Sequence, residues 1–398
     1  MEEWKSYKLV DFIEFNPSIS LKKGTMARKI TMDQLTPHSR DIYSWGYEPY
    51  SGGAKFQNGD TIMARITPCL ENGKHAFISL LDDGETAYGS TEYIVMRGKP
   101  GISDNRFVYY LSHYPDFKNA AIKSMVGSSG RQRAQVDVLK NLEFYLPGLE
   151  EQKQIADTLS ALDDKIALNN RINHNLEEQA QALYKSWFID FEPFKGGKFV
   201  DSGLGLIPEG WHVGTLSEIA DITMGQSPSG SSFNEDGRGI VFYQGRTEFG
   251  FRFPSIKLFT TEPTRYAEPH SVLMSVRAPV GDINVALVKC CIGRGLAAIT
   301  AKYNAYSFVF YTLKGKSSEL DLYNGEGTVF GSINRKDLEG LSVLIPPKLI
   351  IQRFNDCIKP IDDSIEIACK EIVSLSYSRD SLLPKLMSGQ LTFDALDC

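Results

Sequence analysis

The chain has 398 residues, of which 42% are hydrophobic and 23% charged, which is typical of a soluble globular protein large enough for two or more domains. Its apolar runs are all shorter than the about 18 residues that a membrane-spanning helix needs, and its first residues lack the basic and apolar regions of a secretion signal, so we expect a cytoplasmic protein. The net charge of −6 divides into +1 for residues 1–148, −3 for 149–200, −2 for 201–346 and −2 for 347–398, which argues against tight nonspecific nucleic-acid binding by the chain alone.

Residues 1–147 are predicted to form a mixed α/β domain. The expected strands are short, rich in β-branched and aromatic residues, and separated by turn signals such as the Asn-Gly pair at Asn58. One helix is expected from Arg106 to Ile122, where apolar residues recur at helical spacing. The expected strands are 61–66, 75–81, 92–97 and 142–146.

Residues 148–193 are predicted to form one long helix, because Pro147 precedes it, Pro193 ends it, and apolar positions alternately four and three apart form a seam down one face. About 40 residues at 1.5 Å each make a rod of about 60 Å. Two asparagines in the seam either fix the register against a partner helix or face solvent where the pattern shifts toward Ile172. The seam consists of Ile155, Leu159, Leu162, Ile166, Asn169, Asn173, Leu176, Ala180, Leu183 and Trp187.

Residues 194–346 are predicted to contain a linker and a second mixed α/β domain. Its expected helix spans 305–315, and the segments with strand composition resemble those of the first domain. The expected strands are 272–276, 283–288, 296–300 and 341–345.

Residues 347–398 are predicted to contain a second long helix, which supplies the partner that the apolar face of the first helix needs. Pro384 predicts a kink or a restart of this helix. Ile350 and Ile351 stand where the first helix has glutamates, which leaves the start of the second helix open. The seam consists of Phe354, Ile358, Ile361, Ile365, Ala368, Ile372, Leu375, Arg379, Leu382 and Leu386, with Arg379 as its only charged member.

The two halves of the chain resemble each other. LEFYLPGLEEQ from Leu142 matches LSVLIPPKLII from Leu341, and ALDDKI from Ala161 matches PIDDSI from Pro360, both at a spacing of 199 residues. We therefore predict an α+β fold in which two mixed α/β domains form a pseudo-twofold repeat, separated by two long helices.

The sequence contains no complete catalytic or metal-binding motif. The Gly-Lys-Ser at Gly315 lacks the first glycine of a phosphate-binding loop, because Phe310 stands there. The glycine-rich run from Gly203 lacks the preceding strand and the last glycine of a dinucleotide fingerprint. We find no nucleophile elbow, no HExxH and no base-methyltransferase motif. The six cysteines form no CxxC pair, so we expect reduced thiols and no zinc site.

Polar and glycine-rich loops remain as candidate binding sites. Arg, Lys, Gln and Asn can form paired hydrogen bonds with base edges, and short Gly-Ser loops let backbone amides approach phosphates. At each position the alternative is a solvated loop whose arginine pairs with a nearby carboxylate. The candidate DNA-binding residues are Arg65, Thr67, Lys74, Ser90, Thr91, Ser129, Arg131, Gln132 and Arg133 in the first half, and Gln226, Ser227, Gln244, Arg246, Arg277, Arg294, Thr328, Ser332 and Asn334 in the second.

Several motifs together resemble the specificity (S) subunit of type I restriction-modification systems over essentially the full length. They are PGLEEQKQIADTLSALDDKI, NRINHNLEEQAQALYKSWFIDFEPF, GLGLIPEGW, ENGKHAFI with YGSTEYIVMR, and LLPKLMSGQL. The resemblance implies that the two mixed domains are target recognition domains, and that the helices pack as an antiparallel coiled coil that spaces them. It also implies partner docking by Trp187, Phe188 and Phe191, for which the alternative is a hydrophobic cap between helix and domain.

The resemblance further implies a non-catalytic subunit that binds a bipartite asymmetric target in double-stranded DNA and positions two modification (methyltransferase) subunits and restriction subunits. S-adenosylmethionine, ATP and Mg would bind only to those partners. Two alternatives remain open: a coiled-coil protein-interaction scaffold without DNA binding, and an enzyme whose site the sequence does not reveal. DNA binding that weakens steeply with salt would distinguish the specificity subunit from the scaffold.

Overall fold

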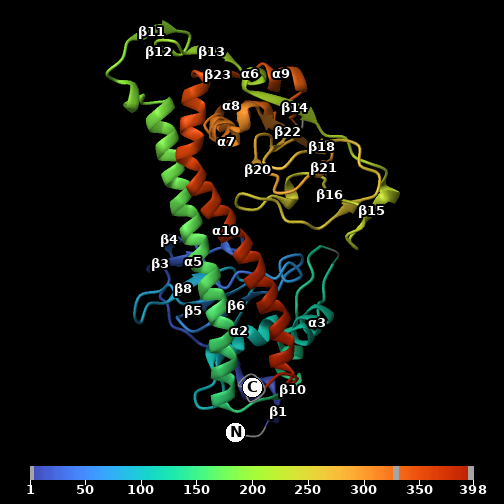
Figure 1. The fold of residues 1–398 in the computed structure, drawn as a ribbon. Helices are drawn as coiled ribbons and strands as arrows, with labels where there is room; N and C mark the ends of the chain where they lie inside the picture. Colours follow the sequence, from blue (N-terminus) through green and yellow to red (C-terminus); the bar gives the residue numbers. More distant parts are fainter. Residues whose placement is uncertain (1–3, 129, 326–330, 393–398) are drawn as a thin grey trace. The chain divides into compact units, whose positions relative to one another are not determined.

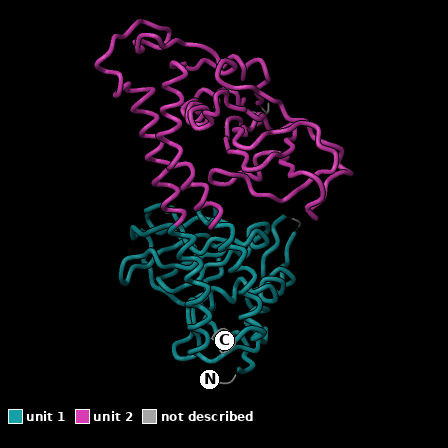
Figure 2. The backbone as a smooth tube through the Cα atoms, in the orientation of Figure 1, with its two compact units in different colours: residues 1–168, 372–398 teal, residues 169–371 magenta. Residues whose placement is uncertain are grey.

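The computed structural model describes residues 4–128, 130–325 and 331–392. The chain forms two compact units, one of residues 1–168 and 372–398 (unit 1) and one of residues 169–371 (unit 2), drawn in Figure 2. The boundaries of these units cross both long helices, whereas the boundaries predicted from the sequence keep each helix whole. The predicted domain boundaries stay a prediction.

Two helices of 40 residues each contribute to both units. Helix α5 spans Leu149–Phe188 and helix α10 spans Lys348–Met387, and Figure 1 shows them side by side. In unit 1 the first turns of α5 share a hydrophobic core with the last turns of α10. In unit 2 the last turns of α5 share a core with the first turns of α10. The two helices are therefore antiparallel in each unit.

Polar residues of the helix seams are buried and partnered across the helix pair. In unit 2, Asn169 Nδ2 donates a hydrogen bond to a carboxylate oxygen of Glu371 at 2.8 Å, and Asn173 Nδ2 contacts Cys369 Sγ at 3.4 Å. Asn169 and Asn173 are 2% and 0% exposed, so the alternative in which they face solvent is wrong. Their contacts agree with a role in helix register.

Proline acts differently at two helical sites. The helix expected over 106–122 is two helices that meet at Pro115, because proline disfavours helical conformation in the residue before it, and Tyr114 adopts φ −58° and ψ 130°. Helix α10, in contrast, continues through Pro384 to Met387, so a restart there is wrong, while a kink stays a prediction. Leu383, Leu386 and Met387 are buried in the core of unit 1, which offsets the hydrogen bond that proline removes.

Unit 1 contains two four-stranded sheets and a two-stranded one. One sheet has the order β2-β9-β6-β7 and is antiparallel, and the other has the order β4-β3-β8-β5, with β3 and β8 parallel. The strands are β1 (Lys5–Lys8), β2 (Ile13–Phe15), β3 (Met26–Ile30), β4 (Gly46–Pro49), β5 (Lys55–Phe56), β6 (Thr61–Ala64), β7 (His75–Phe77), β8 (Ala87–Gly89), β9 (Tyr93–Gly98) and β10 (Glu143–Leu146). The shorter helices are α1 (Leu9–Phe12), α2 (Asn105–His113), α3 (Pro115–Lys123) and α4 (Val136–Lys140).

Unit 2 repeats the main sheet and the strand pair of unit 1, which confirms the predicted repeat. Its second sheet differs, with five strands in the order β15-β17-β16-β21-β18, and β11 and β12 form an additional pair. Its four-stranded sheet β14-β22-β19-β20 corresponds in order to β2-β9-β6-β7, and the pair β13–β23 corresponds to β1–β10. The strands are β11 (Phe199–Ser202), β12 (Gly205–Pro208), β13 (His212–Thr215), β14 (Ala220–Met224), β15 (Phe233–Asn234), β16 (Ile240–Tyr243), β17 (Phe259–Thr260), β18 (Tyr266–Ala267), β19 (Val272–Ser275), β20 (Ile283–Val285), β21 (Cys290–Ile292), β22 (Leu296–Ala301) and β23 (Ser342–Ile345). The shorter helices are α6 (Leu216–Ile219), α7 (Tyr306–Lys314), α8 (Ser317–Asp321) and α9 (Arg335–Glu339).

Each unit has its own hydrophobic core. Helix α2 is buried against the first sheet of unit 1, and helix α7 is buried against the matching sheet of unit 2. Within the described residues, no helix is long and apolar enough to cross a membrane.

Candidate nucleic-acid interface

In unit 1 the loop after the central strand β6 is tied to the segment before α4. Ile66 and Arg133 form a β-bridge, and the backbone N–H of Thr67 donates to the carbonyl oxygen of Gln132 at 3.0 Å. The N–H of Ala134 donates to the carbonyl oxygen of Arg65 at 2.8 Å. The sequence therefore brings Arg65, Thr67, Gln132 and Arg133 together although the two segments lie more than 60 residues apart in the chain.

An ion pair holds the side chain of Arg133 in this loop cluster. Arg133 Nε and Nη2 donate to the carboxylate of Glu92 at 2.9 and 2.7 Å, and hydrogen bonding to that carboxylate raises the pKa of Arg133. Glu92 follows Ser90 and Thr91, so these two predicted residues border the cluster. Sequence reasoning missed Glu92, because nothing in the sequence pairs it with an arginine 41 positions away.

Unit 2 forms the equivalent connection after β19. Arg277 and Ser332 form a β-bridge, and the N–H of Ala278 donates to the carbonyl oxygen of Gly331 at 3.0 Å. The N–H of Ile333 donates to the carbonyl oxygen of Val276 at 3.1 Å. The same loop is thus tied to the segment before a short helix, α4 or α9, in both halves.

A second cluster in unit 2 gathers four predicted residues from three loops. The N–H of Gln226 donates to the carbonyl oxygen of Ile292 at 3.0 Å, and the N–H of Arg294 donates to Ser227 Oγ at 3.3 Å. Gly293 donates to the carbonyl oxygen of Tyr243, the residue before Gln244, at 2.8 Å. Strands β14, β16 and β21 therefore end side by side, with Gln226, Ser227, Gln244 and Arg294 after them.

The arginines of these clusters differ in whether they form an ion pair with a carboxylate. Arg131, Arg277 and Arg294 are exposed, and within the described part of the chain their guanidinium groups form no ion pair. Arg133 pairs with Glu92, and Arg246 pairs with Asp282. These three exposed guanidinium groups are available for base edges or phosphates without breaking an ion pair. Arg65 also has no ion pair among the described residues, but it is half-buried and its Nη2 donates to the carbonyl oxygen of Ala134 at 3.1 Å.

Some predicted residues have structural roles. Lys74 Nζ donates to the carbonyl oxygen of Met32 at 2.7 Å. Asn334 caps the N-terminus of α9, where its side-chain oxygen accepts a hydrogen bond from the N–H of Asp337 at 2.9 Å. Ser129 and Thr328 lie outside the described residues. Their roles and those of the other candidates in DNA binding stay predictions.

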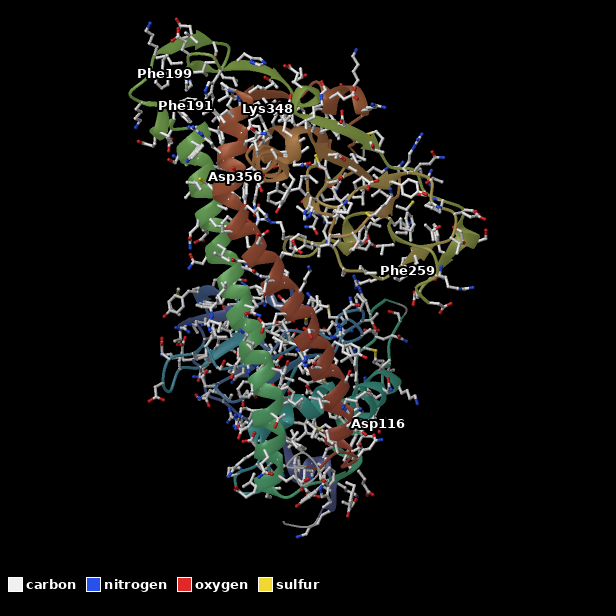
Figure 3. The ribbon with its side chains drawn as sticks, in the orientation of Figure 1. Asp116, Phe191, Phe199, Phe259, Lys348 and Asp356 are labelled. Atoms are coloured by element: carbon white, nitrogen blue, oxygen red, sulfur yellow. The ribbon has the colours of Figure 1, made fainter. Side chains whose placement is uncertain are left out.

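The three aromatic residues predicted to dock partners pack within unit 2. Phe188 is 5% exposed, and its ring centroid lies 4.8 Å from that of Phe354 and 5.8 Å from that of Trp211. Trp187 and Phe191 are half-buried. Figure 3 labels Phe191, which follows the end of α5, and Phe199 of β11. Their ring centroids lie 5.9 Å apart. These contacts match the alternative, a hydrophobic cap between helix and domain, and partner docking by the three residues stays a prediction.

The described residues include five of the six cysteines. In that part of the chain no three His, Cys, Asp or Glu side chains are grouped so that they could hold a metal ion. Cys69, Cys290, Cys291, Cys357 and Cys369 are free thiols, and burial raises the pKa of Cys290 to about 12.

The sequence matches the family described as "Type I restriction modification DNA specificity domain" over residues 1–178 and 208–376. It is 37% identical to the MjaX specificity subunit of Methanocaldococcus jannaschii, over 98% of this chain and 94% of that one. It is 22% identical to the HindI specificity subunit of Haemophilus influenzae, over 98% and 100%. The S subunit structure from M. genitalium has the same fold, with a TM-score of 0.56, 18% identity and coverage of 97% and 96%. The chain therefore belongs to the family of type I restriction-modification specificity subunits.

Proposed function

We propose that this chain recognises a bipartite asymmetric sequence in double-stranded DNA, each unit reading one half through the loops described above. The observation that carries this proposal is the repeated connection between the loop after the central strand and the segment before α4 or α9. In both units it places an exposed arginine without an ion pair beside Gly, Ser or Gln residues. Bidentate arginine contacts with guanine are the commonest specific contacts in the major groove.

The chain acts in this proposal as a non-catalytic component of a cytoplasmic complex. Modification subunits supply S-adenosylmethionine and methylate adenine after base flipping, and restriction subunits supply ATP-driven translocation with Mg. The net charge of −6 supports the need for partners, since a chain of this charge does not neutralise many phosphates alone.

Two exposed apolar side chains on helix α10 are candidates for a surface on which those partners dock. Within unit 1, Val373 and Tyr377 lie four residues apart on one face of α10 and are 71% and 76% exposed. Large apolar side chains this exposed mark interaction sites when they adjoin one another. Trp187 and Phe191, which are half-buried, remain the second candidates for docking.

The proposal is tested by co-expressing this chain with a modification subunit from the same genome and mapping adenine methylation by single-molecule sequencing. We expect one split motif with a fixed gap. A complex that forms normally but leaves no methylated motif would contradict DNA recognition and favour a protein scaffold. A matched control expresses the modification subunit alone, which should leave the motif unmethylated.

A further inference from the structure

Unit 1 contains a buried carboxylate that joins three elements. Asp163 of α5 is 4% exposed and accepts hydrogen bonds from Tyr110 OH of α2 at 2.7 Å and from Arg379 Nη1 of α10 at 2.7 Å. A second arginine binds the neighbouring carboxylate: Arg40 Nη2 donates to Asp164 at 2.7 Å. Both long helices and the recognition domain of unit 1 therefore meet at one point.

Unit 2 contains the corresponding carboxylate on the other helix. Asp362 of α10 is 2% exposed and accepts hydrogen bonds from Tyr311 OH of α7 at 3.2 Å and from Arg252 Nη1 at 2.8 Å. Ser307 Oγ donates to its second oxygen at 2.6 Å. Arg252 also forms an ion pair with Glu177 of α5, so both helices and the recognition domain meet here as well.

The two centres are related by the sequence repeat. Asp163 belongs to ALDDKI and Asp362 to PIDDSI, which match at a spacing of 199 residues. Tyr110 and Tyr311 occupy the same place in the matching helices α2 and α7. The repeat thus retains a carboxylate and a tyrosine, whereas the arginine comes from α10 in unit 1 and from a recognition-domain loop in unit 2.

A buried carboxylate with partners on separate elements is satisfied in only one placement of those elements. Moving the recognition domain along or around its helix would take Arg252, Ser307 and Tyr311 away from Asp362. It would leave Asp163 with only the hydrogen bond from Arg379, and lost donors are costly inside a protein. Buried ion pairs add little to net stability once their desolvation is counted, and in some proteins they fix a unique geometry. The other contacts between domain and helix are largely apolar and tolerate small displacements more easily.

From this geometry we infer that Asp163 and Asp362, each with its tyrosine, are positioning residues that fix the recognition domains on the helices and thereby set the single gap length accepted between the half-sites. The inference rests on the proposed function, because it presupposes a split DNA target. It assigns the reading of the half-sites to the loops and the fixed position of each recognition domain on the long helices to these two centres.

The test compares the methylation patterns of complexes that contain the wild-type chain, the double variant Tyr110→Phe and Tyr311→Phe, or the single variant Asp362→Asn. The tyrosine variants remove two hydroxyl groups and keep both rings in the core. We expect unchanged half-site sequences, with methylation of sites whose gap differs by one base pair increased by about tenfold, the change expected when one charge-assisted hydrogen bond is lost. The control is Tyr109→Phe, since Tyr109 is buried beside Tyr110 and the repeat has Phe310 at the matching position.

The outcomes separate the two levels of inference. If the wild-type complex methylates a split motif and the tyrosine variant retains its single gap, the positioning role is overturned while the proposed function stands. If the wild-type complex methylates no split motif, the proposed function fails first. If Asp362→Asn does not accumulate as a folded protein, the tyrosine variant decides alone, because it leaves no buried charge without its arginine.

Discussion

The two buried carboxylates, Asp163 and Asp362, are each neutralised by an arginine, but the two arginines come from different elements. In unit 1, Arg379 of α10 neutralises Asp163 of α5, so the ion pair links helix to helix directly. In unit 2, Arg252 lies between Glu177 of α5 and Asp362 of α10, so a recognition-domain residue is inserted between the helices. Arg252 is 1% exposed and also lies over the ring of Phe310, with 4.1 Å from its guanidinium carbon to the ring centroid.

A sequence repeat can therefore retain a buried carboxylate without retaining the arginine that pairs with it. A carboxylate on the inner face of a helix can pair with an arginine from any neighbouring element that brings the guanidinium within hydrogen-bonding distance. The difference also makes unit 2 more dependent on one side chain, because Arg252 serves two buried carboxylates and Arg379 serves one.

The largest expected effect comes from removing Arg252. Arg252→Ala leaves Glu177 and Asp362 buried with fewer donors, and we expect a loss of about 3 to 5 kcal/mol in the free energy of unfolding of unit 2. Arg379→Ala should cost less, because it removes the arginine from one buried carboxylate instead of two. Denaturant unfolding with limited proteolysis that assigns the lost stability to a unit checks both. A larger loss from Arg379→Ala would reverse the comparison.

The apolar parts of the helix pair give the next effect. Leu159 is fully buried in unit 1, whereas Leu162, on the same predicted seam, is half-buried. We expect Leu159→Ala to cost about 2 to 5 kcal/mol and Leu162→Ala distinctly less. Leu162→Asp should still lower the thermal midpoint, since it places a charge beside the partner helix. Thermal unfolding of the three variants is the measurement, and unchanged stability in all three would rule out the packed helix pair.

The sequence predicted the elements whose pattern is local. The long helices followed from their seams, and the repeat followed from matched motifs such as ALDDKI and PIDDSI. The sheet containing β3, β4, β5 and β8 was missed, because its strands have two to five residues and too few alternations to stand out.

The contacts that join distant segments could not be predicted. Arg379 was visible as a charge in an apolar seam, but its partner Asp163 lies 216 residues away. Arg252 belongs to a loop with no periodicity, and only the folded chain shows that it is the most completely buried arginine among the described residues. For the candidate interface the sequence indicated the right kinds of loop, while the ion pairs of Arg133 and Arg246 required the structure to be seen.

Acid should lower the stability of unit 1 more than that of unit 2, because unit 1 contains buried histidines. His75 is fully buried, and burial lowers its pKa to about 3, with the charges of Lys118 and His38 adding to the shift. Burial also lowers the pKa of His113, whose ring centroid lies 4.6 Å from that of His75. The folded state therefore holds both imidazoles neutral while the unfolded state takes up protons below about pH 6.5.

Unit 1 should accordingly keep its full stability above about pH 6.5 and lose about 1.4 kcal/mol per pH unit through His75 as the pH falls toward 3. His113 should add a loss in the same direction. In unit 2, burial raises the pKa of Glu177, but Arg252 and Lys314 together lower it by more, so the net pKa is below its ordinary value. The stability that ionised Glu177 contributes is therefore retained above about pH 4.5 and lost only as the pH falls through the lowered pKa. Lowering the pH from 7 to 5 should thus destabilise unit 1 before unit 2, as measured by unfolding at the two pH values. His113→Phe, which keeps an aromatic ring beside Tyr109, should reduce the slope; an unchanged slope would contradict the assignment.

The smallest expected effect concerns DNA and compares a free arginine with a paired one in the same unit. Arg277→Ala should weaken binding of the assembled complex to its cognate site by about 1 to 3 kcal/mol, with little change on random DNA. Arg246→Ala should cost less, because the guanidinium of Arg246 must leave Asp282 before it contacts a base. Fluorescence anisotropy at one fixed salt concentration measures both, since phosphate contacts change with salt. Equal losses on cognate and random DNA would make Arg277 a phosphate contact, and a larger loss for Arg246 would show that its ion pair opens when DNA binds.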